Sequence, residues 1–220
     1  MKNCFEVGIS MIKRMFYKRK MLSWKETYKK AGDLLNAGRK REAFKLMKKL
    51  ACAGYVIAQT GLGIMYDEGI GVGENNAKAV KWFRRAASRG DATAQCNLGI
   101  MYEIGEGVRV DYIKAEKWHR KAAEQGVDQS QHLLGMIYAE GLVGEENPVL
   151  GAGWYRKAAE QGYAAAQYDL GELYYTGRGV EQDFAQAAMW YEKAAAQGDV
   201  RAKDRLIELR EESLCFEENG

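Results

Sequence analysis

Proline, histidine and cysteine are scarce in this 220-residue sequence, which has one proline, two histidines and four cysteines. The cysteines, Cys4, Cys52, Cys96 and Cys215, are too few and too scattered for a disulfide framework, and none forms a Cys-x-x-Cys pair of the kind that binds zinc. No apolar run approaches the roughly 20 residues that a membrane-spanning helix needs. What the sequence has in quantity is glycine: 25 glycines beside a single proline indicate helices joined by short glycine turns.

Charge is unevenly distributed along the chain, although the formal net charge is only +3. Residues 1–49 contain 15 Lys and Arg against 4 Asp and Glu, a net charge of +11, whereas residues 50–220 contain 18 against 26, a net charge of −8. Such a split indicates two surfaces with different roles. The basic part has neither interleaved aromatic residues nor a nucleic-acid-binding motif, so nucleic acid is not expected as a partner.

The basic N-terminal segment, residues 1–23, has three interpretations. It contains apolar residues at the spacing of one helical face: Phe5, Ile9, Ile12 and Phe16. Through this face residues 1–20 would contact an anionic membrane, but a capping helix over the first hairpin is favoured, and a flexible arm is the third interpretation. Because Glu6 interrupts the apolar stretch and the basic clusters follow it, the segment does not resemble a secretion signal, and we expect a cytoplasmic protein.

Six columns of residues recur four times at a spacing of 36 residues. In the first unit the columns are Gly63, Tyr66, Gly69, Trp82, Ala87 and Gly90, and each recurs in step in the other three units. Chance does not place six columns in register four times. The sequence is therefore a tandem repeat.

The residue pattern of each unit predicts two helices. In the second unit, Leu98, Gly99 and Tyr102 share one face of a first helix, which ends at Gly105. The second helix begins at a column of N-cap residues: Asn75, Asp111, Asn147 and Asp183. The only proline, Pro148, follows one of them at the first helical position, where its missing N–H costs nothing. The predicted inner face of the second helix is Ala115, Trp118, Ala122 and Ala123.

The columns divide the chain into seven parts. After the basic segment 1–23 come a degenerate capping hairpin (24–55), four complete repeats (56–91, 92–127, 128–163 and 164–199) and a C-terminal cap helix with a tail (200–220). The predicted fold is all-α: a right-handed α-solenoid of helix-turn-helix repeats with a 36-residue period.

The second unit carries the motif Ala94-Gln95, Leu98-Gly99, Tyr102 and Gly105-x-Gly107-Val108, followed by Trp118 and Ala122-Ala123. This motif resembles the Sel1-like repeat, a relative of the tetratricopeptide repeat. The resemblance is strong over residues 56–199 and weak over 24–55. The third unit departs from it with Gly141-Leu142-Val143-Gly144 in the loop. The resemblance implies a scaffold for protein–protein contacts.

The two histidines have structural interpretations. His119 lies in the aromatic column of Phe83, Tyr155 and Tyr191, and His132 is predicted to be a lone surface histidine. No set of His, Cys and carboxylate residues has the spacing of a metal site or a nucleophilic triad. The glycine loop at 69–72 recurs as a turn and does not follow a strand, which excludes a phosphate cradle. We therefore predict no catalytic residue, no metal and no cofactor.

A cysteine-rich branch of the Sel1-like family is linked to penicillin binding and weak β-lactamase activity, with paired cysteines bridging the two helices of each repeat. No unit of this sequence contains two cysteines, so a β-lactamase-like hydrolase is the least favoured function. Cys52, between Ala51 and Ala53, is predicted to be a small buried hydrophobe.

In related helical arrays the first helices line the concave face, and four columns of this sequence lie off their packing stripe. The predicted partner-binding residues are Thr60, Ile64, Asp67, Glu68, Cys96, Ile100, Glu103, Ile104, His132, Met136, Glu140, Tyr168, Glu172 and Tyr175. An apolar ridge flanked by acidic residues predicts a protein or peptide partner with apolar anchors and basic character. The alternative is that Ile100 and Met136 pack between neighbouring hairpins.

The predicted function is thus a non-catalytic scaffold that acts as an adaptor or regulator through its concave face. A bacterial immunity protein that blocks a cognate toxin or secreted effector is the alternative within the same class. The charge split adds a further hypothesis, in which the basic segment folds over the acidic groove, within one chain or between two.

Overall fold

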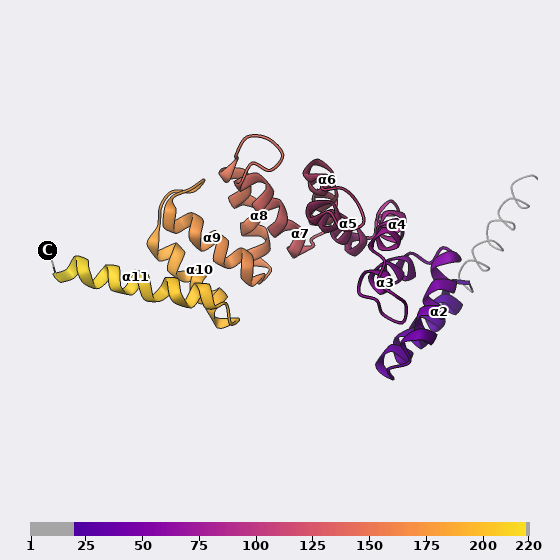
Figure 1. Cartoon of the computed structure of the whole chain (residues 1–220). Coiled ribbons are helices and arrows are strands. Elements are labelled where there is room, and N and C mark those ends of the chain that lie inside the picture. The colour runs from indigo at the N-terminus through magenta and orange to yellow at the C-terminus, as the bar shows by residue number, and fades with distance from the viewer. Residues whose placement is uncertain (1–19, 219–220) are drawn as a thin grey trace, which may run out of the picture. The chain divides into compact units, whose positions relative to one another are not determined.

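The computed structural model describes residues 20–218, with side chains as far as residue 211. This part of the chain is helical throughout and contains no strand (Figure 1). A helix over residues 20–36 comes first. It is followed by α2 (Lys40–Cys52), α3 (Val56–Asp67), α4 (Asn76–Ala87), α5 (Ala92–Ile104), α6 (Tyr112–Ala123), α7 (Asp128–Ala139), α8 (Pro148–Glu160), α9 (Ala164–Thr176), α10 (Phe184–Ala196) and α11 (Val200–Glu218).

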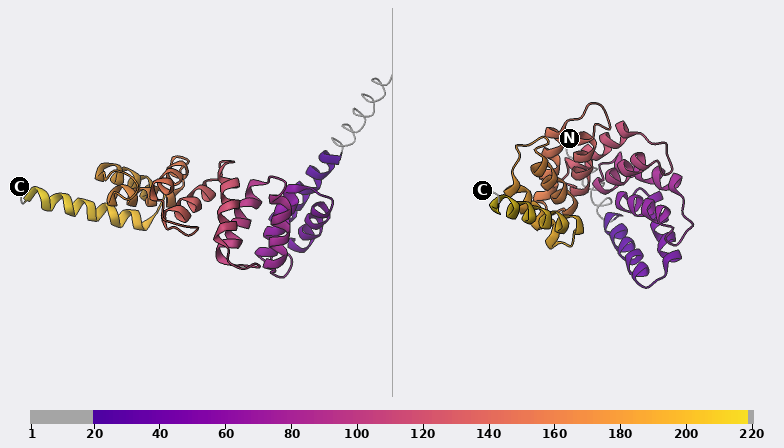
Figure 2. Two further views of the ribbon diagram at one scale, coloured as in Figure 1. Left: turned by 90° about the horizontal axis from the view of Figure 1, so that it is seen from above. Right: turned by 60° about the vertical axis from the view of Figure 1, so that its left-hand side comes forward.

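The helices belong to two compact units. Unit 1 consists of residues 1–94 and 106–108, and unit 2 consists of residues 95–105 and 109–220. Within the units the first helix of a repeat packs on its second helix: α3 on α4, α7 on α8, and α9 on α10 (Figure 2). The predicted fold class, an all-α repeat solenoid, is confirmed, while its right-handed sense stays a prediction. The amphipathic pattern in residues 5–16 lies outside the described residues.

A close contact in every repeat joins a glycine of the first helix to a ring of the second. A Cβ atom on Gly135 would lie 2.4 Å from Cδ1 of Tyr155, and one on Gly171 would lie 2.6 Å from Cε1 of Tyr191. The same contact joins Gly63 to Phe83 and Gly99 to His119. Because only glycine leaves room for the ring, this position sets how closely the two helices approach.

The N-cap column behaves as predicted from its residue types. In α4, α6, α8 and α10 the side chain of the N-cap residue accepts a hydrogen bond from the backbone N–H three residues on, at 2.9–3.0 Å. The backbone N–H of the same residue donates to the carbonyl of the repeat's tyrosine, as from Asp111 to Tyr102 at 2.8 Å. One residue therefore both starts the second helix and ties it to the end of the first.

Buried glutamines link consecutive hairpins. The side-chain amide of Gln131 donates to the carbonyl of Ala123 at 3.2 Å, and its Oε1 accepts from Gln161 at 2.7 Å. Gln167 repeats both contacts with Ala159 and Gln197. A buried amide with both of its polar atoms satisfied is stabilising, so this column specifies how one repeat stacks on the next.

The third repeat has a different loop because it lacks the second glycine of the Gly-x-Gly motif. A Cβ atom on Gly179 would lie 2.4 Å from the carbonyl carbon of Pro148, so this loop packs on the start of the preceding second helix. Gly71 and Gly107 make the same approach to Lys40 and Asn76. In the third repeat Val143 occupies this position, and its loop takes a different course with Gly144 at φ 159°.

Two local predictions need correction. Trp118 is only half-buried, whereas Ala115, Ala122 and Ala123 are buried as predicted, because the next residue along the helix, His119, fills the space against the first helix. Cys52 is exposed rather than buried, since the last turn of α2 turns its side chain to solvent. None of the described helices is both long and apolar enough to span a bilayer.

The glycine–ring contact makes a testable prediction. Substitution Gly135→Ala forces a methyl group into the Tyr155 ring, and we expect the free energy of unfolding to fall by at least about 2 kcal/mol in urea denaturation. Gly153→Ala, on α8, is the matched control because no atom lies within 4 Å of the added Cβ. The control should gain about 0.5–1 kcal/mol from helix propensity. Equal effects of the two changes would contradict the steric role of Gly135.

The N-cap contacts make a second prediction. Asp183→Ala removes the acceptor of the Gln186 N–H, and we expect a loss of about 0.5–2 kcal/mol in the free energy of unfolding. Asp183→Asn keeps a side-chain oxygen in the same place and should retain most of the stability. If both variants unfold at the same urea concentration, below that of the wild type, the contribution of this residue comes from its charge rather than from capping.

Candidate functional site

An exposed stripe runs along the first helix of each repeat on the side turned away from the core. On α7 it consists of Gln129, Leu133, Met136 and Glu140, which follow one another at helical spacing, while Leu134 on the opposite side is fully buried. The corresponding residues of the neighbouring helices lie beside them. We term this surface the first-helix face of unit 2. Its residues are Asn97, Ile100 and Ile104 of α5, Gln129, Leu133, Met136 and Glu140 of α7, Ala165, Asp169, Glu172 and Thr176 of α9, and Arg201, Arg205 and Glu208 of α11.

Half of the predicted partner-binding residues lie on such a stripe. In unit 2 these are Ile100, Ile104, Met136, Glu140 and Glu172, all half-buried or exposed. In unit 1, Ile64 and Glu68 occupy the same positions on α3.

The column that begins with Thr60 is displaced from the stripe. Thr60 and Cys96 are only 5% and 3% exposed, so they do not offer a surface to a partner. The Thr60 hydroxyl donates to Asp91 at 3.0 Å, and burial raises the pKa of the Cys96 thiol. The physical reason is helical geometry: at 100° per residue this column lies about 70° away from the centre of the stripe.

Later members of that column are partly buried and hold polar contacts of their own. His132 is not a lone surface histidine, because its Nε2 lies 2.6 Å from Oδ2 of Asp169 and its ring packs against Tyr155 and Tyr163. Tyr168 is half-buried, with the guanidinium of Arg201 4.1 Å from its ring centroid.

The column of Asp67, Glu103 and Tyr175 lies on the same flank and is half-buried. Oε2 of Glu103 is 3.4 Å from Nε2 of the fully buried His119. Burial, with help from the nearby Glu106 and Glu68, raises the pKa of Asp67. These carboxylates therefore contribute less to an exposed acidic surface than the sequence predicts.

The sequence prediction missed the column of Asn97, Leu133, Asp169 and Arg205. Its members lie three residues before the column of Ile100 and Met136, and so on the same side of the helix. That spacing was the signal in the sequence that would have identified them.

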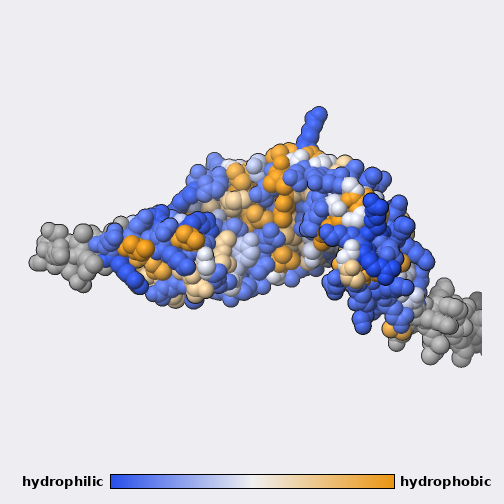
Figure 3. Space-filling model, turned by 60° about the horizontal axis from the view of Figure 1, so that its bottom comes forward, coloured by the Kyte–Doolittle hydropathy of each residue, from blue (hydrophilic) through white to orange (hydrophobic). Residues whose placement is uncertain are grey.

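The part of the face on α5 and α7 is apolar. It presents Ile100, Ile104, Leu133 and Met136, of which Ile104 is 54% exposed. Met136 also packs partly against the core of the third and fourth repeats, so it supports the fold as well. Apolar side chains gather into a band near the middle of the surface drawn in Figure 3, with hydrophilic surface on both sides.

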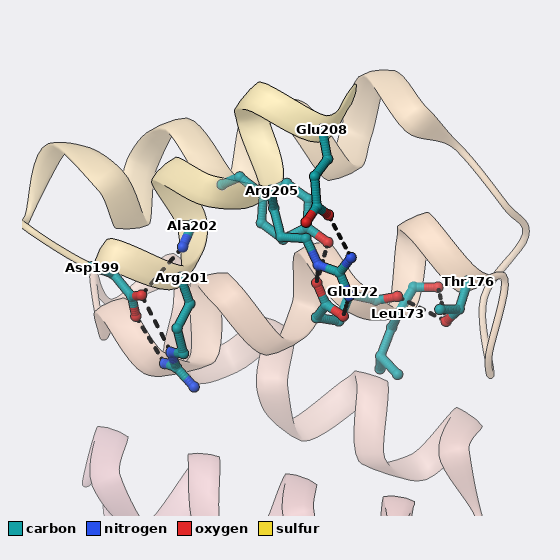
Figure 4. Close-up of polar contacts among 9 residues, drawn as sticks. Glu172, Leu173, Thr176, Asp199, Arg201, Ala202, Arg205 and Glu208 are labelled. Atoms are coloured by element: carbon teal, nitrogen blue, oxygen red, sulfur yellow. Dashed lines mark hydrogen bonds and ion pairs between the residues drawn. The ribbon is translucent and has the colours of Figure 1, made fainter. Parts of the chain in front are cut away.

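The part of the face on α9 and α11 is charged and is held by Arg205 (Figure 4). Arg205 donates from Nε and Nη2 to the two carboxylate oxygens of Glu172, at 2.8 and 2.9 Å, and from Nη1 to Glu208 at 2.7 Å. Glu172 also accepts from the hydroxyl of Tyr191 at 2.5 Å. The hydrogen bond with Glu172 raises the pKa of Arg205 above its usual range, so the guanidinium stays charged.

Most acids of this face have a partner within the chain. Asp169 pairs with His132, Glu172 and Glu208 pair with Arg205, and Glu140 lies 3.0 Å from Nη1 of Arg178. These four acids share two arginines and a histidine, so the predicted acidic flank is partly neutralised in unit 2.

The described residues give little support for metal binding or for cysteine chemistry. No group of three His, Cys, Asp or Glu side chains among them is arranged to hold a metal ion. Cys52 and Cys96 lie among residues 20–211, whose side chains the structure describes, and both are free thiols.

The repeats match a known family model, and the fold is similar to solved structures. The Sel1 repeat model matches residues 39–55, 56–91, 92–127, 128–163 and 164–199. Among solved structures, the chain is similar to c5321, a protective antigen of uropathogenic Escherichia coli strains with an SLR fold, at 38% identity and a TM-score of 0.82 over 87% of this chain. This chain spans 42% of the length of that protein. No curated protein matches the chain.

Two other structures extend the comparison. A Sel1 repeat protein from Oxalobacter formigenes is 34% identical with a TM-score of 0.75, over 81% of this chain and 75% of its own. The immunity protein Pa5087 from Pseudomonas aeruginosa is 23% identical with a TM-score of 0.52, over 82% of this chain and 68% of its own, and this likeness concerns the fold alone. With five repeat matches over most of its length, the chain belongs to the Sel1 repeat family.

Proposed function

We propose that this chain is a non-catalytic scaffold that binds a protein partner through the first-helix face of unit 2. The observation that carries the proposal is the apolar patch of Ile100, Ile104, Leu133 and Met136 beside a fixed network of ion pairs. Sel1 repeat proteins are in general scaffolds without catalytic activity, which agrees with this assignment.

The apolar patch would supply most of the binding energy. Its four side chains lie on two neighbouring helices, so one partner segment would contact all of them together. Apolar anchors at the centre of an interface, surrounded by polar groups that exclude water, typically dominate affinity. The helices that carry them are fixed by the glycine–ring contacts, so little conformational entropy is lost on binding.

The charged part would set the orientation of the partner. Arg205 is held by three hydrogen bonds, and its planar guanidinium is already fixed before a partner arrives. A preformed array of alternating charge favours one register of a partner and disfavours others.

The character of the partner follows from this charge balance. The sequence alone predicts a basic partner, but Glu140 and Glu172 are paired with arginines of the same chain. We therefore propose a protein segment with apolar anchors and polar groups of both signs. The cytoplasmic location expected from the sequence stays a prediction.

An immunity role is the second candidate within this class. It is supported only at the level of the fold, by the similarity to the immunity protein Pa5087. In that role the partner would be a toxin, and the gene would lie beside a toxin or secreted-effector gene. An adaptor would lack such a neighbour.

Binding through the apolar patch is tested by Ile104→Asp. We expect this change to weaken partner binding at least about tenfold, because a carboxylate would be buried without a partner at the centre of the interface. The measurement is titration calorimetry with a partner first isolated on the wild-type chain and then purified.

The matched control is Ile113→Asp. Ile113 is an even more exposed isoleucine of unit 2, at 72%, but it lies at the start of α6 and outside the first-helix face. Both variants should melt within a few degrees of the wild type, since both side chains are exposed. Equal loss of binding in the two variants, or none in either, would argue against the patch.

The hydrolase alternative makes a separate prediction. Incubation of the chain with nitrocefin should give no hydrolysis above the buffer rate, because the Ser130 hydroxyl beside His119 is fully buried and the Cys96 thiol is only 3% exposed. A Cys52→Ser variant controls for slow thiol chemistry at the exposed cysteine. Turnover by both proteins would overturn the scaffold proposal.

A further inference from the structure

A groove of about 390 Å³ lies in unit 1 between the helix over residues 20–36 and α2. Its apolar lining includes Leu34 and Leu46, and its charged lining is Lys30, Arg39, Glu42 and Lys45. The groove is on the side of α2 turned away from α3. The opposite side of α2 faces α3, with Phe44 against Tyr66 and Met47 against Gly61.

The groove is positively charged. Glu42 is paired with Arg39 through two hydrogen bonds of 2.7 Å, which leaves the exposed Lys30 and Lys45 to set the sign of the rim. The surroundings add to this charge, since residues 20–49 contain ten Lys and Arg against three Asp and Glu.

The C-terminal part of α11, in unit 2, has the opposite charge and is acidic. Its first turns pack on α10, where Ala202 is buried and Leu206 and Leu209 join the core cluster of Tyr191. The helix has 19 residues, and its C-terminal part extends past α9 and α10 in both views (Figures 1 and 2). Residues 211–218, which follow the ion-pair network of Arg205, contain four Glu and neither Lys nor Arg. The C-terminal end of a helix also carries negative partial charge.

We propose that this chain associates head to tail, with the C-terminal part of α11 of one copy docked in the groove of unit 1 of a second copy. The acidic end of α11, which extends past α9 and α10 in Figure 1, would meet a basic groove whose lining includes Leu34 and Leu46. The exposed Ile207 on α11 would add apolar contact to this association. The association uses neither the apolar patch nor the ion-pair network of the first-helix face, so it stands independently of the proposed function.

The two contacting surfaces differ, so the interface is heterologous. Each copy would offer the groove of unit 1 to one neighbour and α11 of unit 2 to another, so assembly gives either a closed ring or an open filament. Because exposed charges contribute much of the attraction, added salt should weaken it.

Sedimentation velocity of the full chain at increasing concentration tests the proposal. We expect species larger than the monomer at low salt and dissociation at high salt. A Lys30→Glu, Lys45→Glu variant and a Glu211→Lys, Glu212→Lys variant should each associate at least about tenfold more weakly. Lys81→Glu, an exposed lysine on α4 away from the groove, is the matched control and should associate like the wild type.

Mixing the two double variants gives the decisive measurement. The first variant has negative charge on both its groove and α11, and in the second residues 211–218 carry two Glu against two Lys and have lost their net negative charge, so neither should associate alone as strongly as the wild type. In an equimolar mixture the unchanged basic groove of the second variant meets the unchanged acidic α11 of the first, and species larger than the monomer should return. Their return also shows that both variants are folded.

Three outcomes would overturn the proposal. One is a monomer at every concentration, as expected if residues 1–19 cover the groove of their own chain. Another is association that survives both charge reversals and high salt, which would indicate a different interface. The third is a mixture of the double variants that stays monomeric although each melts like the wild type.

Discussion

The contact between a glycine of the first helix and a ring of the second is the interaction on which every repeat depends. It fixes the distance between the helices, and it places the other residues of the hairpin relative to the core. The ring is Phe83, Tyr155 or Tyr191 in three repeats and His119 in the second, and each lies directly against its glycine. The second repeat therefore fills the same space with a polar ring. The consequence is a buried cluster in which Glu103 and Ser130 lie 3.4 and 3.5 Å from the two ring nitrogens of His119.

Because the glycine, leucine and tyrosine positions of the first helix are committed to this packing, the outward stripe is left to vary. One position of the stripe is Ile100 in the second repeat, Met136 in the third and Glu172 in the fourth, with no change in the helices that carry it. An apolar patch and a charged network thus lie on one repeated framework. The framework supplies rigidity, and the variable residues supply whatever chemistry recognises a partner.

The structure shows where the unevenly distributed charges of the chain lie. Part of the basic excess surrounds the groove beside α2, and part of the acidic excess lies on the extended end of α11. The acids of the first-helix face are largely paired within the chain, so net charge counted along the sequence overstated the acidity of that face. Surface charge depends on which pairs form, and these three pairs join residues 33 to 38 positions apart, in neighbouring repeats.

The sequence by itself determined the repeat, the helix pair in each unit, the N-cap at Asp111 and the ring slot of His119, because these depend on local spacing and on columns that recur four times. Half of the residues that it predicts for partner binding lie on the exposed stripe, and their role in binding stays a prediction. Only the tertiary structure showed that Thr60 and Cys96 are buried, that His132 is bonded to Asp169, and that Arg205 belongs to the same face as Met136. Exposure at the flank of a helix is decided by the neighbouring hairpin, whose distance and rotation are set by the glycine–ring contact and the buried glutamines. The spacing of residues along the sequence does not contain that information, because a difference of about 70° around the helix axis is enough to move a residue from the surface into the core.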